Sequence, residues 1–573
     1  MYPHAPARTP PTCAPRLRPP HPTPPHTPRI RIPVRTRERN RTLHPSAHLP
    51  ASPAEEAVAA ELSAVRPALG PAYAAALSGA RAAVLTRLWR ALAFEPLPWV
   101  VRRHHSPGGL ALRLAGGARL EGPAPDPYAT GPYVSELLLD GRAYRQAARL
   151  MTALGVPHGA EFAAELDGST ASLALSRAGR AGLADAPPQA AWEWEQRVVD
   201  GHPYHPNCRS RPGFSVAEQL AYAPEHRPVV ELGLVAVRAE ECLVTGDWPA
   251  RLRDGGRILV PVHPWQAAHT LKRESVRAGF AARPLMALRT LAAAGPGGAG
   301  GAGGAEDVAG AHGVDVKTAL STRLTSSVRD ISVYSVETAA LLSAFAQTLS
   351  ERLDGRLHIT RTLGAATAYS PDLAAVLREP PEVYADAAAG ERVVPVAALA
   401  HFPAARSAVW QAAFARLALS VCLRVLELGV ALEAHGQNLL VVVSATGAPL
   451  RLVYRDLADI RISPVRLARH GLPVPPLSGR LITDDETVLR RKLFGSLLTG
   501  ALGATAGSAG AFAEVLAEAS GGLSPTADTE ALMIGPLPTK ALTLMRLSPG
   551  VPGDQWAELR NPLAIRRQSR DPR

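Results

Sequence analysis

Apolar residues recur at helical spacing in the first part of the folded chain. Residues 53–65 predict a helix, because Glu55 and Glu56 lie in its first turn and Pro67 forces the residue before it out of helical geometry. Residues 73–93 predict a second helix, whose leucines share one face. The same periodicities predict strands at 99–104 and 110–114, joined by residues 106–109, and helices at 135–154 and 160–177.

The middle of the chain, roughly residues 200–340, changes character. Proline and glycine divide it into short segments such as 257–262 and 330–337. Residues 297–305 consist only of glycine and alanine. They lack the preceding strand and the following Gly-Lys-Ser/Thr of a phosphate-binding loop, so we interpret them as a flexible surface insertion.

Helices are expected to dominate again from about residue 338. The clearest lies at 407–429, where Gly429 is expected to end it. The C-terminal part is also predicted to be mostly helical, and no internal repeat is evident.

The composition is that of a soluble globular protein. The 573 residues are 46% hydrophobic and 20% charged, and this length predicts several structural units. Four widely spaced cysteines without a CxxC pair argue against a disulfide framework or a structural zinc site and favour the cytoplasm. No uninterrupted apolar run reaches the roughly eighteen residues of a membrane span, and the first residues lack the apolar stretch of a secretory signal.

The net charge of +12 suggests nucleic-acid binding, but its distribution does not support that interpretation. Residues 1–50 hold nine arginines and one glutamate, so they carry +8 and leave only +4 for the rest of the chain. Fourteen prolines in the same segment predict a disordered tail, or upstream sequence included by a misplaced start. A basic docking arm is the alternative. We therefore expect no nucleic-acid partner.

Three polar blocks carry the candidate chemistry, and the first spans residues 201–215. Its prolines and glycines prevent a regular helix. Arg209 and Arg211 suit an anion, because a guanidinium group holds carboxylate or phosphate through two parallel hydrogen bonds. A polar surface loop is the alternative. His202 and His205 could bind a metal, but the sequence indicates no third ligand.

The second block is Lys317 together with residues 322–330. Hydroxyl side chains alternate there with Arg323 and Arg329, a combination that suits triphosphate oxygens or substrate carboxylates. An edge strand with solvated charges is the alternative.

The third block, residues 433–438, leads into a buried strand at 439–443, a tight turn and a second strand at 450–454. Antiparallel pairing of these strands would bring Asn438 close to Arg455 and Asp456. Amide and carboxylate oxygens are the hard ligands that Mg²⁺ prefers.

Other side chains of this third block could contact a nucleotide. His435 and Gln437 can donate to phosphate, and Glu433 is a further candidate acid. A helix-to-hairpin connection with satisfied polar groups is the alternative.

Taken in order, these blocks resemble the signature of the NRPS-independent siderophore synthetases, the aerobactin-synthetase-like family. The matching stretches span about residues 200–563, and the first 200 residues carry little that matches. They are residues 201–215, 262–266, 325–329, 433–438 and 455–456, and a C-terminal segment that runs from Pro538-Thr539-Lys540 through 545–547 to 561–563. Each motif is moderately specific, but six in the correct order are a strong signal.

That resemblance implies an α+β fold shaped like a hand, with helical N- and C-terminal parts around a mixed, largely antiparallel β region. After the tail at 1–50, it implies a thumb-like region at 51–195 and a fingers region at 196–345 with the nucleotide- and acid-binding loops. A mostly helical palm would follow at 346–573, with ATP bound between fingers and palm.

The resemblance also implies the reaction. A substrate carboxylate attacks the α-phosphate of ATP to give an acyl adenylate and pyrophosphate, and an amine or hydroxylamine then releases AMP. No covalent enzyme nucleophile is needed, and no convincing Ser-His-Asp or Cys-His arrangement is present. The expected partners are ATP, Mg²⁺, a carboxylic acid of the citrate or succinyl type and the amine or hydroxylamine, without nucleic acid or membrane. Which acid, which nucleophile and whether the chain forms a homodimer are left open.

Carried over by position, the resemblance assigns Arg329 and His435 to catalysis, Arg329 and Ser327 to substrate binding, Asn438 and Asp456 to Mg²⁺, and His205, Arg209, Arg211, Lys317, Thr325, Ser326, Gln437 and Asn438 to ATP. Two positions depart from the family. Lysine is usual where this chain has Arg209, which exchanges a point charge for a planar fork. An acidic residue is usual near 358–363, where this chain has Arg361, and that departure concerns the substrate pocket more than ATP.

A kinase-like phosphotransferase is the main competing interpretation. A loop with histidine and asparagine, a hairpin and an aspartate also describes small-molecule kinases. Those enzymes place an aspartate base two residues after the histidine, where this chain has Gln437. A non-catalytic ligand-binding or regulatory protein on the same scaffold is the second alternative, motivated by Arg209 and Arg361.

Overall fold

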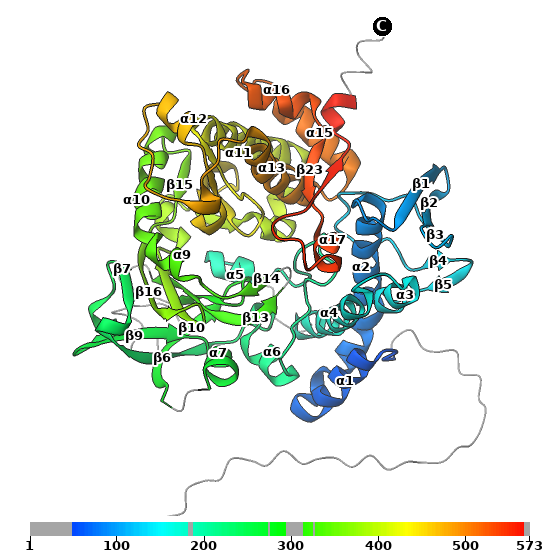
Figure 1. Ribbon diagram of the computed structural model, residues 1–573, viewed down its shortest axis with the longest axis horizontal. Helices are drawn as coiled ribbons and strands as arrows, with labels where there is room; N and C mark the ends of the chain where they lie inside the picture. Colours follow the sequence, from blue (N-terminus) through cyan, green and yellow to red (C-terminus); the bar gives the residue numbers. More distant parts are fainter. Residues whose placement is uncertain (1–48, 181–186, 273–274, 294–312, 325–326, 566–573) are drawn as a thin grey trace, which may run out of the picture. The chain divides into compact units, whose positions relative to one another are not determined.

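The computed structural model describes residues 49–180, 187–272, 275–293, 313–324 and 327–565, and these belong to one compact unit that runs from residue 47 onward. The predicted tail, except its last two residues, and the glycine–alanine segment at 297–305 lie outside the described residues. Helices and largely antiparallel sheets alternate along the described chain, which confirms the predicted α+β class (Figure 1).

The N-terminal region combines packed helices with a small antiparallel sheet. Helix α2 (Gly70–Phe94) packs against α4 (Gly159–Arg180), and both share one hydrophobic core with the sheet (Figure 1). The other elements are α1 (Pro53–Val65), β1 (Val100–Ser106), β2 (Gly109–Leu114), β3 (Arg119–Gly122), β4 (Leu137–Leu139), β5 (Arg142–Tyr144) and α3 (Ala147–Leu154). These bounds confirm the predicted helices at 53–65, 73–93 and 160–177 and the first predicted hairpin.

The helix predicted over residues 135–154 is wrong in its first half. Asp140 and Gly141, with φ values of 49° and 78°, form a two-residue turn between β4 and β5. Asp-Gly favours this left-handed hairpin turn, which a helix cannot contain. Only the second half, α3, is helical. The turn residues therefore outweigh the apolar spacing, which fits either element.

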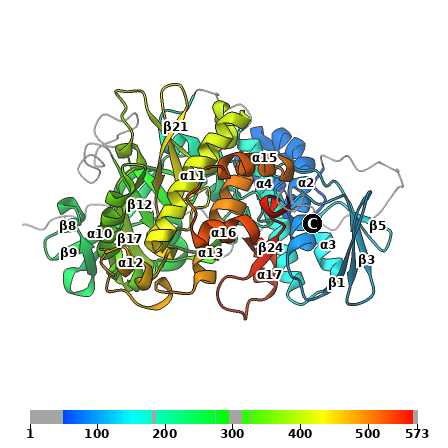
Figure 2. The same cartoon turned by 90° about the horizontal axis from the view of Figure 1, so that it is seen from above.

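A nine-stranded sheet forms the middle of the described chain, in the order β7-β16-β17-β12-β11-β10-β6-β9-β8, and each neighbouring pair is antiparallel. Apolar side chains along its strands form a core of their own, and Figure 2 shows β12 beside β17. The strands are β6 (Val230–Arg238), β7 (Leu243–Gly246), β8 (Arg253–Asp254), β9 (Arg257–Val262), β10 (Arg277–Pro284), β11 (Thr290–Ala293), β12 (Val314–Thr318), β16 (Thr362–Ser370) and β17 (Leu373–Arg378).

The expectation that helices dominate from about residue 338 is wrong for the next sixty residues. Helix α10 (Ala339–Ser350) is followed by strands, of which β16 and β17 complete the nine-stranded sheet. Alanine-rich stretches such as 365–368 favour a helix by propensity, but pairing between strands overrides this preference. The sheet therefore extends past residue 345, where the fingers region was expected to end.

The C-terminal part is built around α11 (Ala408–Leu428), which confirms the clearest predicted helix. It ends at Gly429, whose φ of 115° is left-handed. Helix α11 lies beside α15 (Ala509–Ser520) and packs on β21 (Figure 2). The other elements include β15 (Leu357–Ile359), β18 (Arg392–Pro395), β20 (Leu439–Val443), β21 (Pro449–Tyr454), α12 (Pro464–Arg469), α13 (Glu486–Phe494), the π-helix η12 (Gly495–Leu502), α16 (Ala527–Ile534), β23 (Leu537–Lys540), α17 (Leu542–Leu547) and β24 (Trp556–Leu559).

Strands β20 and β21 pair as the sequence predicts. They are antiparallel, with Leu439 opposite Tyr454. Just beyond this pair, the backbone N–H of Arg455 donates to the carbonyl oxygen of Asn438 at 3.0 Å. The expected closeness of Asn438 to Arg455 is therefore confirmed.

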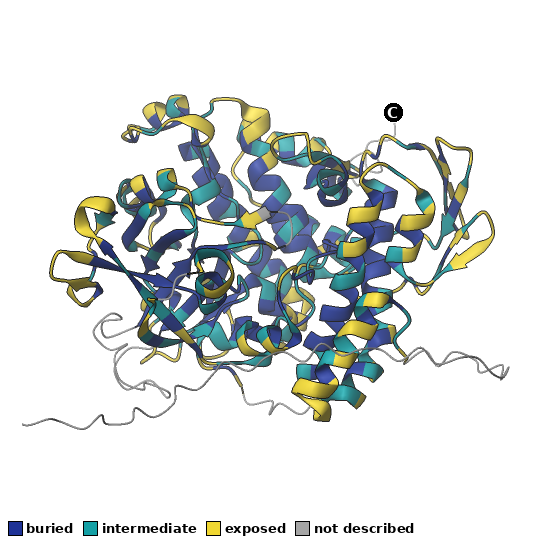
Figure 3. Cartoon of the chain, turned by 60° about the horizontal axis from the view of Figure 1, so that its bottom comes forward, coloured by how far each residue is buried: buried dark blue, intermediate teal, exposed yellow. Residues whose placement is uncertain are grey.

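Within the described residues, α11 is the one helix whose length and composition would allow it to cross a membrane. Arg416 and Arg424 interrupt its apolar sequence, so the sequence alone showed no continuous run of that length. Most of the helix is buried in the C-terminal core, which is the usual position of an apolar helix in a globular domain. Figure 3 shows the buried residues gathered in the interior of the described part and the exposed residues at its edges and loop tips.

Glu95 joins the N-terminal helices to the C-terminal segment. It follows α2, and its carboxylate accepts hydrogen bonds from the backbone N–H groups of Thr543 (3.2 Å) and Leu544 (2.7 Å) at the start of α17. The residue is 1% exposed. This burial raises the pKa of Glu95 to about 7, although the two backbone donors favour the charged form.

Glu95 should make folding depend on pH. Its pKa in the folded chain, about 7, lies above the ordinary value of 4.5, so the folded state binds more protons between these values. Stability attributable to Glu95 is therefore complete below about pH 4.5 and is lost as pH rises through 7, by on the order of 3 kcal/mol. Urea unfolding at pH 4.5 and 7.5 measures how much the free energy of unfolding falls with pH. Glu95→Gln should make this fall smaller. The exposed-site variant Glu56→Gln should keep it, and equal slopes in all three proteins would contradict this account.

Candidate functional site

A cavity of about 1400 Å³ is lined by side chains from the N-terminal helices, the nine-stranded sheet and the C-terminal part. All predicted site residues whose side chains are described line it, namely His205, Arg209, Arg211, Lys317, Arg329, His435, Gln437, Asn438 and Asp456. Thr325, Ser326 and the side chain of Ser327 lie outside the described part. Tertiary structure therefore brings the three polar blocks to one cavity.

Four cations surround the carboxylate of Asp456. Lys317 Nζ donates to Asp456 Oδ2 at 2.6 Å, and Arg378 Nη1 lies 3.9 Å from the same oxygen. Arg289 and Arg329 interact electrostatically with this carboxylate. All five side chains line the cavity, so this part of it carries a net positive charge.

The crowding of cations perturbs their pKa values. Burial lowers the pKa of Lys317 to about 8, with Asp456 opposing the shift and Arg289 adding to it. Burial and the neighbouring Arg329 lower the pKa of Arg289 to about 10. Burial would raise the pKa of Asp456, but Lys317 and Arg378 outweigh it and hold the carboxyl far below its usual range. A bound anion would relieve the repulsion among these cations.

Asp456 also has an unusual backbone conformation. Its φ of 75° lies in the left-handed region, which costs a residue with a side chain about 1–2 kcal/mol. Tyr454 Oη donates to the carbonyl oxygen of Asp456 at 3.2 Å, and the N–H of Ala458 donates to its Oδ1 at 3.4 Å. Strain of this kind persists where neighbouring contacts hold it, and it is concentrated at functional sites.

The loop at 433–438 presents a neutral histidine. The N–H of Gln437 donates to His435 Nδ1 at 3.2 Å. Burial is the main cause that lowers the pKa of His435, so the ring is neutral at pH 7. Because Nδ1 accepts a hydrogen bond, we assign the ring proton to Nε2, which can donate to an anionic oxygen.

Asn438 and Asp456 offer oxygen donors that fit a divalent cation. Asn438 Nδ2 donates to the carbonyl oxygen of Glu433 at 3.3 Å, which leaves the amide oxygen to serve as a ligand. Mg²⁺ is usually held by one or two carboxylates, and waters and substrate phosphates complete its shell. The donor chemistry therefore fits Mg²⁺, and the Lys317 ammonium competes with it for Asp456.

Arg209 and Arg211 are held by protein groups. Arg209 donates to the carbonyl oxygens of Val198 at 2.6 Å and Val199 at 2.9 Å, and Arg211 Nη2 lies 2.6 Å from Glu225 Oε1. Burial would raise the pKa of Glu225, but the two arginines outweigh it and hold the carboxyl far below its usual range. The planar fork of Arg209 reaches two carbonyl oxygens, which a lysine ammonium could not do in the same geometry. Their predicted roles toward ATP stay predictions.

His205 is buried, with 2% exposed, and neither ring nitrogen makes a hydrogen bond to a described residue. Burial, together with Arg329 and Arg546, lowers the pKa of His205 to about 3. A neutral ring that lines the cavity in this way can bind a ligand oxygen. The ring centroid of His202 is 6.2 Å away, and within the described chain no third metal-binding side chain joins the pair.

Sequence reasoning missed Arg289, Thr360, Arg378 and Lys540 as site residues, although all four line the cavity. Arg378 ends the apolar strand β17, and a charge there is a signal that could have marked it. The buried hydroxyl of Thr360 has no hydrogen-bond partner among the described residues. Arg361, by contrast, is exposed and does not line the cavity.

The sequence of this chain matches the IucA / IucC family over residues 190–296 and 305–401. Over these residues the chain is similar to this family. The match covers the first two polar blocks and the strands of the nine-stranded sheet. A further family, described as ferric iron reductase FhuF-like transporter, matches residues 408–518, which include α11 and the 433–438 loop.

Solved structures share this fold. The chain is 17% identical to the petrobactin biosynthesis protein AsbB from Bacillus anthracis, with a TM-score of 0.69. The superposition covers 91% of this chain and 99% of that one. It is 20% identical to the ATP-bound aerobactin synthetase IucA from Klebsiella pneumoniae, with a TM-score of 0.65. That superposition covers 85% of this chain and 99% of the other. These likenesses confirm the expected fold class.

A curated relative covers less of the chain. The uncharacterized protein y4xN from Sinorhizobium fredii is 24% identical over 371 residues, which is 51% of this chain. The matched part spans 56% of that relative, so the chain covers about half of its length.

Lys317 should make anion binding depend on pH. Its ammonium is charged below a pKa of about 8 and neutral above it, so affinity for inorganic pyrophosphate should fall as pH rises through 8. Lys317→Met should weaken binding about ten-fold at pH 7 and much less at pH 9.5. Calorimetric titration of both proteins with pyrophosphate across this pH range gives the ratio of their two affinities. Protonation of pyrophosphate itself affects both affinities equally and cancels in this ratio. Lys272→Met, at an exposed site outside the cavity, should match the wild type at both pH values. A ratio that does not change with pH would contradict the assignment.

Proposed function

We propose that this protein is an ATP-dependent synthetase that adenylates a di- or tricarboxylic acid and condenses it with an amine or hydroxylamine in siderophore biosynthesis. The observation that carries the proposal is the cavity in which Arg289, Lys317, Arg329 and Arg378 surround Asp456. The match to the IucA / IucC family, and a fold shared with a petrobactin biosynthesis protein and an aerobactin synthetase, support it.

The charge in the cavity suits a reaction between two anions. A carboxylate and the triphosphate of ATP repel each other, so their approach requires cations on both sides. Lysine and arginine supply this charge, and a buried site strengthens each interaction because water is excluded. The size of the cavity, about 1400 Å³, is sufficient for a nucleotide together with a small acid.

The proposed steps need no covalent intermediate with the protein. A carboxylate oxygen bonds to the α-phosphorus while the bond to the β-phosphate oxygen breaks, and pyrophosphate leaves. The amine nitrogen then bonds to the acyl carbon, the bond to AMP breaks, and the nitrogen loses its proton to water. These steps release AMP and pyrophosphate.

In this scheme six of the residues that line the cavity have defined tasks. Arg329 binds the substrate carboxylate, and His435 donates through Nε2 to an oxygen that gains charge. Lys317 and Gln437 contact the phosphates. Asn438 and Asp456 would hold Mg²⁺, which neutralises phosphate charge when bound.

A kinase-like activity is the alternative that the site favours less. Gln437 lines the cavity at the position where such kinases place an aspartate base, and glutamine cannot accept the proton of a substrate hydroxyl at neutral pH. ADP as the product would support a kinase, whereas AMP and pyrophosphate support the synthetase. A non-catalytic binding protein would bind ATP without turnover.

The match to FhuF-like proteins does not lead to a second proposal. An iron reductase needs an electron-transfer group, and Cys422, the one cysteine in residues 408–518, is buried in the hydrophobic core. Its surroundings raise the pKa of this thiol by burial, to about 12, which disfavours the thiolate that would bind metal.

A pyrophosphate-release screen should identify the acid. Citrate, a citrate monoamide, a succinyl-hydroxamate and 2-oxoglutarate are tested, each with and without diamines, amino acids and hydroxylated amines. We expect release that depends on the acid, and AMP in amounts equal to the amide formed. No acid-dependent release, or ADP instead of AMP, would contradict the proposal.

Arg329→Ala and His435→Ala should each lower adenylation with the identified acid by about 10²–10³, because each loses a charge-stabilising contact. Thermal unfolding should show that both variants remain folded. Arg361→Ala is the matched control, since it removes an exposed arginine that does not line the cavity. Wild-type rates in both site variants would refute the assignment of these residues.

A further inference from the structure

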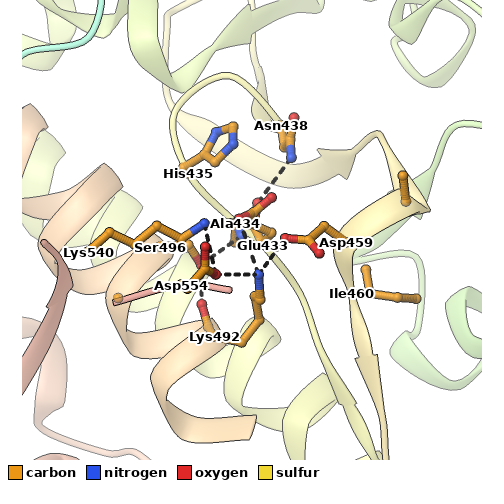
Figure 4. Close-up of polar contacts among 12 residues, drawn as sticks. Glu433, Ala434, His435, Asn438, Asp459, Ile460, Lys492, Ser496, Lys540 and Asp554 are labelled. Atoms are coloured by element: carbon orange, nitrogen blue, oxygen red, sulfur yellow. Dashed lines mark hydrogen bonds and ion pairs between the residues drawn. The ribbon is translucent and has the colours of Figure 1, made fainter. Parts of the chain in front are cut away.

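Lys492 is a buried lysine that the proposed mechanism does not use. It lies on α13, its side chain is 2% exposed, and it does not line the cavity. Figure 4 shows three carboxylates converging on its ammonium group. The distances from Nζ are 2.6 Å to Asp459 Oδ2, 3.3 Å to Glu433 Oε1 and 3.5 Å to Asp554 Oδ2.

These carboxylates have the spacing of metal ligands. One oxygen of each lies within 4.8 Å of the other two, and no other group of three such side chains in the described part of the chain has this spacing. Lys540 Nζ also contacts Glu433 at 2.8 Å and Asp554 at 3.1 Å. Lysine ammonium groups thus supply the positive charge that a metal ion supplies when carboxylate oxygens bind one.

The three carboxylates come from segments that carry the site. Glu433 precedes His435 by two residues, and Asp459 ends the short turn Leu457–Asp459, which begins at the left-handed Asp456. Asp554 lies between β23 and β24. A single ammonium therefore ties together the His435 loop, the Asp456 turn and the C-terminal segment.

A contact from η12, the π-helix that continues α13, supports the same loop. Ser496, one turn after Lys492 along the helical segment, accepts a hydrogen bond from the backbone N–H of Ala434 at 2.9 Å. The carbonyl oxygen of Glu433 in turn accepts from the N–H of His435 at 2.9 Å. Displacement of α13 would therefore shift the histidine as well as the Asp456 turn.

We propose that Lys492 is a positioning residue whose ammonium takes the place of a metal ion among Glu433, Asp459 and Asp554 and thereby fixes the loops that present His435 and Asp456 to the cavity. The effect on catalysis rests on the proposed function, whereas the occupation of the carboxylate site does not. Burial would raise the pKa of Asp459, but Lys492 outweighs it and brings the value to about 2, so this carboxyl group is ionised at neutral pH.

Lys492→Met tests the first half of the proposal. Methionine matches most of the lysine stem and lacks the ammonium, so the three carboxylates regain an open cation position. Mn²⁺ titration of the nucleotide-free protein, followed by electron paramagnetic resonance, should show one more bound ion per chain than in the wild type. Arg491→Met changes the neighbouring exposed cation on the same helix and should bind Mn²⁺ as the wild type does.

The second half concerns the reaction. Pyrophosphate exchange with the acid identified in the screen should be at least about ten-fold slower in Lys492→Met, the effect expected when a supporting residue behind a site is lost. Arg491→Met should retain the wild-type exchange rate.

Loss of a buried ammonium can unfold a protein because it leaves carboxylates without a partner. The double variant Lys492→Met, Asp554→Asn keeps the net charge of the wild type and removes the third carboxylate. It should melt near the wild-type temperature, bind no additional Mn²⁺, and still exchange pyrophosphate at least about ten-fold more slowly.

A folded Lys492→Met variant that binds no additional Mn²⁺ overturns the proposal. Wild-type exchange in either the single or the double variant also overturns it. If the wild type exchanges pyrophosphate with no acid, the proposed function fails, and the Mn²⁺ count alone then decides whether Lys492 occupies a metal-type site.

Discussion

Positive charges confined to one cavity repel each other, and the carboxylate of Asp456 faces four of them. Lys317 makes the closest contact, at 2.6 Å, and the left-handed backbone of Asp456 is held by Tyr454 and Ala458. An arrangement with so little negative charge is poorly satisfied by the protein alone. The cavity is therefore organised for ligands that bring negative charge, as nucleotides and polycarboxylic acids do.

The fold meets this constraint by drawing on distant parts of the chain. Lys317 and Arg378 come from adjacent strands β12 and β17 of the nine-stranded sheet, whereas Asp456 follows β21 in the C-terminal part. The sheet supplies Lys317 and Arg378, and the C-terminal part supplies their counter-charge and the neutral His435. Such a site is complete only when both parts are folded against each other.

The ion-pair cluster around Lys492 lies at the wall of the same cavity, which Glu433, Asp459, Asp554 and Lys540 line. There three carboxylates meet two lysine ammonium groups, and Arg461 and Arg480 also pair with Asp459. The cations around Asp456 leave positive charge open to a ligand, whereas Lys492 lies outside the cavity lining and its side chain is 2% exposed. A rigid, internally neutralised support beside an electrostatically unsatisfied cavity lets the site bind charge without rearranging its own loops.

The sequence by itself determined the local elements and the polar blocks. Helical periodicity located α1, α2, α4 and α11, and the pattern at 433–456 indicated the hairpin that places Asn438 beside Arg455. The predictions from sequence were wrong at the Asp140-Gly141 hairpin, where turn residues outweigh apolar spacing, and in strand β16, where pairing between strands overrides the helix propensity of alanine. Only the tertiary structure decided that Arg289 and Arg378 join the cavity, that Glu225 holds Arg209 and Arg211, and that Lys492 lies among three carboxylates. The physical reason is that charge compensation acts between side chains remote in sequence, so no local pattern records which carboxylate a given cation will meet.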